Sequence, residues 1–187
     1  MNKRHIITIA GEHASGQGSL SNSLQKELGY EIYRNGQYAR KLAKEMGMTI
    51  VEFQTYLNEH EELDRQIEKS ASEYAATHDN LIVDAKLGWY AIPDSFKVYL
   101  KVDIDVAAKR VFNDEKRKDT ETFETIEEVK EQIRYRYNEE NVRWFKTYGI
   151  KREDMSNYDL VIDTSNLSIE EVNEIVLKEY KKWLEEK

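Results

Sequence analysis

The sequence predicts an α/β fold of three layers, in which helices flank a parallel β-sheet on both faces. Strand-like apolar segments alternate with segments of helical periodicity along the whole chain. The strand-like segments are rich in β-branched residues and show little alternation, which is typical of strands buried on both faces. No Gly/Pro/Ser-rich linker or repeat divides the 187 residues, so we expect a single domain over residues 1–187.

Five apolar segments are the expected strands. They are IITIA (6–10), YEIYR (30–34), NLIVD (80–84), FKVYLKV (96–102) and YDLVIDTS (158–165). Apolar residues at helical spacing fill the intervals, as at Leu20, Leu24 and Leu28. The predicted helix boundaries are Gly29, Gly47, Thr49 with Glu52, Asp103 or Asp105, Thr125 with Glu128, Gly149, and Ser168 with Glu171.

Composition argues against several classes of function. Lys and Arg number 28 against 36 Asp and Glu, and this net charge of −8 argues against a protein that binds a nucleic-acid polymer through a general basic surface. The absence of cysteine excludes disulfides, thiolate metal sites and cysteine nucleophiles, and the four histidines show no ligand spacing. The N-terminal apolar run is too short for a signal peptide, and no segment approaches the roughly 18 apolar residues of a membrane span. We therefore expect a cytoplasmic protein without a membrane partner.

A glycine-rich loop, GEHASGQGSL (11–20), joins the first strand to the first helix. Gly11 and Gly16 have the spacing of a phosphate-binding P-loop, but Gln17 and Gly18 stand where that motif continues with lysine and a hydroxyl residue. Backbone N–H groups and the positive helix end suit an anion whatever the side chains are. The candidate phosphate cradle consists of Gly11, Ser15, Gly16, Gln17, Gly18 and Ser19. An ordinary glycine-rich turn remains the alternative, because the spacing is permissive.

Basic residues after the middle of the chain form a second candidate. Lys116, Arg117 and Lys118 lie in the segment 113–123, which has no apolar periodicity and is typical of a mobile flap. Arg136 and Arg143 are seven residues apart on the next helix, so both could point with Arg110 and Arg117 toward one polyanion. The alternative is a solvated helix face.

Asp84 ends the third expected strand, and Lys86 follows it. Ligands of open α/β sheets bind beyond the carboxyl ends of the strands, so both side chains are placed to meet a substrate or a metal-bound water. The alternative for Asp84 is a cap on the following turn.

Together these residues resemble the P-loop nucleoside monophosphate kinases, and most closely their cytidylate kinase-like branch. Besides the loop, the resemblance covers NGQYARKLAKEMGM, VDAKLGWYAIPDSFKVYLKVD, RYRYNEENVRWFKTYGI and NYDLVIDTSNLSIEEV, which is nearly the whole chain. It implies a P-loop NTPase-type fold with a helical monophosphate-binding region at about 34–78 and a short basic lid at about 113–124.

The resemblance also implies roles for individual residues. The lid would close over ATP and a pyrimidine nucleotide, and Arg110, Arg117, Arg136 and Arg143 would neutralise the phosphoryl group in transfer, beside Asp84. Gly36, Arg40 and Lys86 would hold the acceptor monophosphate. The implied cofactors are ATP and Mg²⁺, and the implied acceptor is CMP or dCMP.

The residues that depart from the family pattern lie in the segments that would bind the phosphates. Besides Gln17 and Gly18, the residues Arg34 and Asn35 replace small ones, Gln37 replaces an acidic one and Lys86 replaces an arginine. Ser19, one position late, could supply the hydroxyl for the metal. Phosphoryl transfer depends on positioning and charge, so a slow kinase is expected. A nucleotide-binding module with little turnover and a kinase for another small acceptor are the alternatives.

Overall fold

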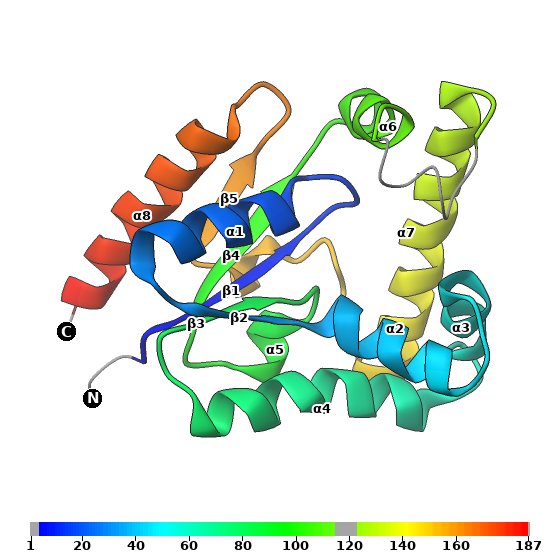
Figure 1. The fold of residues 1–187 in the computed structure, drawn as a ribbon, viewed down its shortest axis with the longest axis horizontal. Helices are drawn as coiled ribbons and strands as arrows, with labels where there is room; N and C mark the ends of the chain where they lie inside the picture. The colour runs from blue at the N-terminus through cyan, green and yellow to red at the C-terminus, as the bar shows by residue number, and fades with distance from the viewer. Residues whose placement is uncertain (1–3, 115–122, 187) are drawn as a thin grey trace.

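Residues 4–114 and 123–186 are described by a computed structural model, and they form a five-stranded sheet between layers of helices (Figure 1). The strands are β1 (Ile6–Gly11), β2 (Glu31–Arg34), β3 (Leu81–Asp84), β4 (Phe96–Lys101) and β5 (Leu160–Asp163). Their order is β2-β3-β1-β4-β5, and each of these pairings is parallel. The structure confirms the predicted three-layer α/β fold.

Two pairs of helices cover the sheet (Figure 1). On one face lie α1 (Gln17–Leu28) and α8 (Ile169–Glu185), where Leu20, Leu24 and Val176 are buried against strand residues. On the other face lie α4 (Glu61–Thr77) and the short α5 (Gly88–Ala91), and there Ala71 and Ala75 pack on the sheet. Because alternate strand residues face opposite layers, each strand is buried on both sides, which explains its unbroken apolar sequence.

The remaining helices stand beyond the carboxyl ends of the strands (Figure 1). They are α2 (Asn35–Glu45), α3 (Ile50–Tyr56), α6 (Ile104–Phe112) and α7 (Ile126–Tyr148), and a short 3-10 helix follows at Met155–Asn157. α2, α3 and α4 share a separate apolar cluster around Phe53 and Ile67. The candidate site lies at this end of the sheet, at the carboxyl ends of the strands.

Most predicted helix ends are confirmed. Capping boxes open α3 and α8, and left-handed glycines follow α1 and α7. Of the two candidates at α6, Asp103 is the cap, because its carboxylate accepts hydrogen bonds from the N–H groups of Asp105 and Val106. The helix α5 was not predicted, since four residues are too few to show a periodicity. Within the described part of the chain, no helix is long and apolar enough to cross a membrane.

Candidate active site

The glycine loop has the backbone of an anion cradle. Gly16 precedes α1 with φ of 97°, a left-handed conformation that favours glycine, and Ala14 also has positive φ, at 60°. Gly11 is required for a different reason, because a Cβ there would lie 2.6 Å from Ser15 Oγ and 2.7 Å from the Leu100 carbonyl oxygen. The buried Ser15 hydroxyl has no hydrogen-bond partner within the described residues. The first turn of α1 therefore points its N–H groups into a tightly folded loop.

The two departures in this loop have clear structural consequences. Gln17, at the position where the motif has lysine, is a neutral amide. Its Nε2 atom donates to the carbonyl oxygen of Ile9 in β1 at 3.3 Å. Gly18 brings no hydroxyl, and a Cβ there would lie 4.0 Å from Asp84 Oδ2. Ser19 is exposed at the cleft surface. The cradle offers phosphate its backbone and the helix end, without a lysine.

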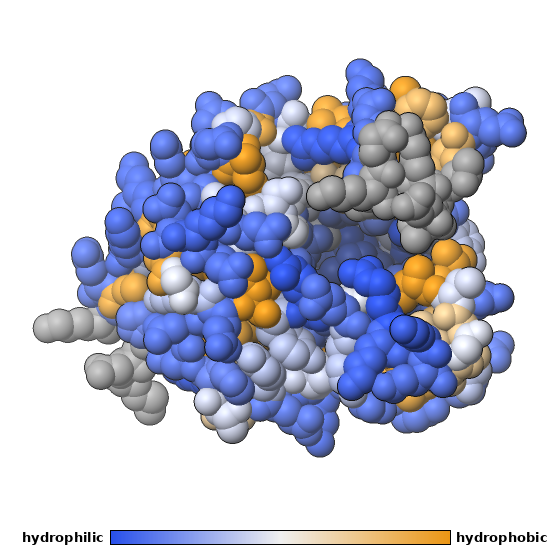
Figure 2. Space-filling model, in the orientation of Figure 1, coloured by the Kyte–Doolittle hydropathy of each residue, from blue (hydrophilic) through white to orange (hydrophobic). Residues whose placement is uncertain are grey.

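A cleft of about 630 Å³ opens in front of the loop. Figure 2 shows this hollow, whose visible walls are mostly hydrophilic. Four cationic side chains from separate elements line it together with the carboxylates Asp84 and Asp114, and they are Arg34, Arg40, Lys86 and Arg110. The structure thus places the predicted residues Ser15, Gly16, Gln17, Gly18, Ser19, Gly36, Arg40, Asp84, Lys86 and Arg110 around one cavity, whereas Gly11 is not part of its lining. A cleft in which cationic side chains outnumber carboxylates suits a polyanionic ligand.

Asp84 lies at the centre of this cleft, at the carboxyl end of β3. Burial raises the pKa of its carboxyl group, while the nearby Arg34, Arg40 and Lys86 oppose that rise. Its Oδ2 atom is 3.6 Å from Arg34 Nε. Within the described residues no group of three His, Asp or Glu side chains could hold a metal ion by itself. A carboxylate such as Asp84 can nevertheless hold Mg²⁺ when phosphate oxygens supply further ligands.

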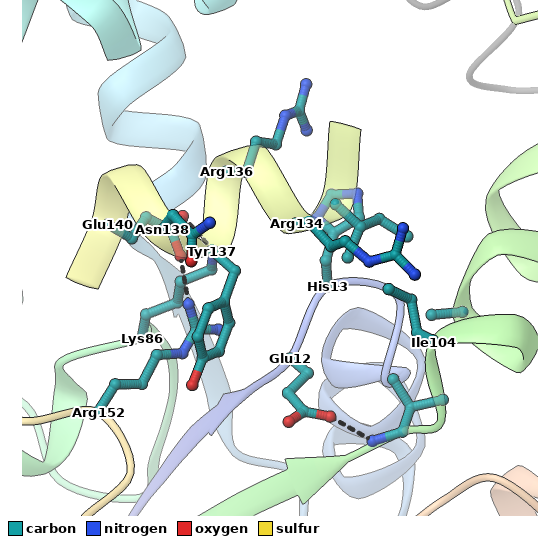
Figure 3. Close-up of a pocket in the computed structure, with 13 residues that line it drawn as sticks. Glu12, His13, Lys86, Ile104, Arg134, Arg136, Tyr137, Asn138, Glu140 and Arg152 are labelled. Atoms are coloured by element: carbon teal, nitrogen blue, oxygen red, sulfur yellow. Dashed lines mark hydrogen bonds and ion pairs between the residues drawn. The ribbon is translucent and has the colours of Figure 1, made fainter. Parts of the chain in front are cut away.

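Lys86 has a buried partner that the sequence did not reveal. Its ammonium group is paired with Glu140 Oε1, and Glu140 Oε2 accepts from Arg152 Nη1 at 2.9 Å. Figure 3 shows this chain of charges beside Tyr137, whose ring centroid is 4.3 Å from the Arg152 guanidinium carbon. Burial lowers the pKa of Lys86, whereas Lys86 and Arg152 hold the pKa of Glu140 below its ordinary value despite burial. Lys86 reaches the cleft as expected, but with its charge already paired.

Arg110 reaches the glycine loop, as expected. Its guanidinium donates to the Ala14 carbonyl at 3.2 Å and to the Thr164 carbonyl at 2.7 Å. It also lines an adjoining recess of about 230 Å³ between the loop and the start of α8. Arg110 therefore holds the loop and borders two cavities at once.

Arg136 and Arg143 do not converge with Arg110 in this structure. Arg143 Nε is 2.9 Å from Asp64 Oδ1, and Arg143 lines a neighbouring pocket instead of the cleft. Arg136 lines the recess between α6 and α7, and Figure 3 shows its side chain pointing away from Lys86 and Glu140. Arg117, with Lys116 and Lys118, lies outside the described residues, as does most of the expected lid.

A second pocket, of about 210 Å³, adjoins the cleft and shares Gly36, Asp84 and Lys86 with it. Asn35 Nδ2 donates to Glu68 Oε2 at 3.1 Å, while the buried Asn35 Oδ1 has no partner within the described residues. Burial, together with the neighbouring Asp64, raises the pKa of Glu68 to about 8. The pocket thus combines a neutral acid, an unused acceptor and the fixed Arg143. The family resemblance pointed to this region, but it did not single out Asn35, Asp64 or Glu68 as site residues.

A strand, a glycine cradle and a helix beside a cationic cleft define the P-loop kinase class of fold. Consistent with this, the structure is similar to the shikimate kinase of Bacteroides thetaiotaomicron, with a TM-score of 0.66 at 14% identity over 94% of this chain and 98% of that one. This likeness concerns the fold alone.

Sequence comparison gives the family. The model of the cytidylate kinase-like family matches residues 6–166. A cytidylate kinase of Thermococcus kodakarensis is 38% identical over 162 residues, which are 86% of this chain and 80% of the relative. The chain belongs to the cytidylate kinase-like family, and this membership supports a nucleotide kinase.

A further relative is a much longer protein. An S-adenosylmethionine-dependent nucleotide dehydratase of Lacinutrix mariniflava is 30% identical over 94% of this chain. The match takes up 36% of that relative, so the chain spans about a third of its length.

Proposed function

We propose that the protein transfers the γ-phosphoryl group of ATP to a pyrimidine nucleoside monophosphate, CMP or dCMP. An acceptor phosphate oxygen forms a bond to the γ-phosphorus, the bond to the β,γ-bridging oxygen breaks, and ADP leaves with the nucleoside diphosphate. The observation that carries this proposal is the pair of adjoining cavities. The cleft at the glycine loop suits the phosphates, and the pocket behind Gly36, Asp84 and Lys86 suits a single-ring base.

The chemistry of the second pocket favours cytosine over uracil. Cytosine has an exocyclic amine that donates, whereas uracil has a carbonyl oxygen at the same position. The buried Asn35 Oδ1 lacks a partner within the described residues, so it can accept from that amine. Uracil would leave this acceptor unpaired, which typically costs about 1–3 kcal/mol.

Three residues would hold the acceptor phosphate and the metal. Arg40 lies at the cleft beside Gly36, since a Cβ on Gly36 would be 3.6 Å from Arg40 Nη2. Asp84 would hold Mg²⁺ together with phosphate oxygens, and the Ser19 hydroxyl lies on the same cleft. The metal would neutralise phosphate charge and keep the reacting groups aligned.

A nucleotide-binding module with little turnover is the second candidate. The observation in its favour is the neutral Gln17 side chain tied to Ile9, together with the missing hydroxyl at Gly18. Calorimetry measures the binding of each nucleotide, and a turnover assay measures phosphoryl transfer. The two measurements together separate the two candidates. Tight binding of both nucleotides without phosphoryl transfer would favour the module.

A coupled kinase assay across CMP, dCMP, UMP, AMP and GMP tests the proposal. We expect CMP or dCMP to give the highest kcat/KM. The variant Asn35→Leu should lose more of its kcat/KM for CMP than for UMP, because it removes the acceptor for the amine. Preference for a purine nucleotide or for UMP would contradict the assignment of the pocket.

A further inference from the structure

The glycine loop lacks the positive charge that a transferred phosphoryl group needs. Gln17 is neutral and donates to the Ile9 carbonyl, and Gly18 has no side chain. The loop therefore offers a phosphate only its backbone N–H groups and the partial charge of the helix end. Enzymes of this chemistry surround the transferred group with full positive charges, because its oxygens share negative charge in the transition state. Another side chain must supply that charge if the loop is to support transfer.

Four cations line the cleft in front of the loop, but Lys86 is already paired with Glu140, and Arg110 donates to backbone carbonyl groups. Arg34 enters the same cleft from β2. It is the last residue of β2 and the residue before α2, so its backbone is fixed between two regular elements. Its side chain is 24% exposed and crosses from the edge strand toward α1, where Nη2 donates to Asn22 Oδ1 at 2.6 Å. Arg34 lines the same cleft as the loop residues Ser15 to Ser19.

Asp84 lies close both to Arg34 and to the first turn of α1. Its Oδ2 is 3.6 Å from Arg34 Nε and 4.0 Å from the position that a Cβ on Gly18 would occupy. The guanidinium group and the first turn of α1 therefore approach the same carboxylate oxygen. The absence of a side chain at Gly18 keeps the space between them open.

The contact between Arg34 and Asp84 is loose enough for an anion to compete. Charge-assisted hydrogen bonds between nitrogen and oxygen are usually about 2.7–2.9 Å long, whereas this pair is separated by 3.6 Å. A guanidinium has five N–H donors in a planar fork, which suits two phosphate oxygens at once. Asp84 keeps the group at the cleft without closing a short ion pair.

We propose that Arg34 supplies, from β2, the positive charge that position 17 lacks, and that it binds the ATP phosphates held by the glycine loop. This inference rests on the proposed function and names a phosphate-binding residue of the same site. It joins two departures from the family pattern, since the neutral residue in the loop and the arginine at the end of β2 compensate for each other. The cation has moved from α1 to the opposite wall of the cleft.

A double-substitution cycle tests the compensation. ATP affinity is measured by calorimetry at constant ionic strength, and kcat with CMP is measured in parallel, for the parent, Arg34→Gln, Gln17→Lys and the double variant. Arg34→Gln should weaken ATP binding by about tenfold or more, the loss expected for one charge-assisted contact. Gln17→Lys should change the parent by less than about threefold, yet it should restore most of the affinity of Arg34→Gln.

Lys69→Gln is the matched control, because it removes one positive charge from an ammonium group on α4 whose side chain is 72% exposed. It should bind ATP like the parent. If Arg34→Gln does not fold, Arg34→Met, which keeps the aliphatic stem, takes its place in the cycle.

Three results would overturn the inference. They are parent-like ATP affinity in Arg34→Gln, an equal gain from Gln17→Lys with and without Arg34, and an effect of Arg34→Gln on CMP affinity alone. ATP binding reports on Arg34 even if no monophosphate is turned over. Failure of the proposed function is therefore distinct from failure of this inference.

Discussion

At the scale of single residues, the candidate site is made of groups whose charge state depends on burial. Asp84 and Glu68 both have a raised pKa, and burial is the main cause for each. For Glu68 the result is a carboxyl group that is mostly neutral at pH 7 and therefore able to donate as well as accept. Groups of this kind collect at functional sites more often than elsewhere.

Glu68 should make folding stability depend on pH. Its pKa is about 8 in the folded chain against an ordinary 4.5, so the folded state binds the proton more tightly. The stabilisation is complete below about pH 4.5 and is lost as the pH rises toward 8, by at most about 1.4 kcal/mol per pH unit. Glu68→Gln should flatten this part of the curve in urea unfolding at pH 5, 6.5 and 8. Glu62→Gln, an exposed control on the same helix, should show the same pH dependence of the unfolding free energy as the parent. An unchanged pH dependence in Glu68→Gln would contradict the raised pKa of Glu68.

Arg40 should matter for the acceptor and much less for ATP. It lies beside Gly36 on the cleft wall, so Arg40→Ala should weaken CMP binding by about tenfold through the loss of one charge-assisted contact. Calorimetry with CMP and with ATP measures both affinities, and Lys41→Ala, which alters an exposed neighbour, is the control. Equal affinity for CMP in the parent and in Arg40→Ala would remove this residue from the acceptor site.

At the scale of elements, α7 connects the site to the rest of the fold. Glu140 pairs with Lys86 after β3 and with Arg152 after α7, and Arg143 pairs with Asp64 on α4. These contacts join segments that are far apart in the sequence. The ion pairs of Glu140 and Arg143 hold α7 in place as one wall of the second pocket.

The sequence predicted this helix but not its contacts. Capping residues, glycines and periodicity are local, so they located most elements and the glycine loop. The pairing of Glu140 with Arg152 depends on how the chain turns after Gly149, and no local pattern encodes that turn. Arg136 and Arg143 share a helix face, as expected, but seven residues separate them by about 10 Å along the axis. Both side chains border a narrow pocket between α3 and α7, but Arg136 also lines the recess toward α6, whereas Arg143 lines the pocket behind Gly36.

Removing the charge of Glu140 should destabilise the fold. Glu140→Gln leaves Lys86 and Arg152 without their shared carboxylate in a buried setting, which typically costs about 3–5 kcal/mol. The free energy of unfolding from urea titration measures the loss. Glu131→Gln, at an exposed position of the same helix, is the matched control and should stay within about 0.5 kcal/mol of the parent. Similar stabilities for the two variants would contradict the structural role of this network.

At the scale of the whole molecule, the fold gathers the site at one edge of the sheet. The carboxyl ends of β1, β2 and β3 carry the glycine loop, Arg34 and Asp84, and residues of α2, α4 and α7 line the second pocket behind them. Membership of the cytidylate kinase-like family and the two adjoining cavities together support phosphoryl transfer between nucleotides. In the proposed account, the departures at positions 17, 18 and 34 change the source of the charge while this arrangement stays the same.

The most direct test is a count of products from CMP and ATP with Mg²⁺. Chromatography or phosphorus NMR follows CDP, ADP and inorganic phosphate through a single reaction, with Arg40→Ala as the variant impaired in acceptor binding. We expect CDP and ADP to form in equal amounts, with little inorganic phosphate and with a much lower rate for Arg40→Ala at limiting CMP. Formation of ADP and inorganic phosphate without CDP, or no turnover of CMP and dCMP while both nucleotides bind, would contradict the account.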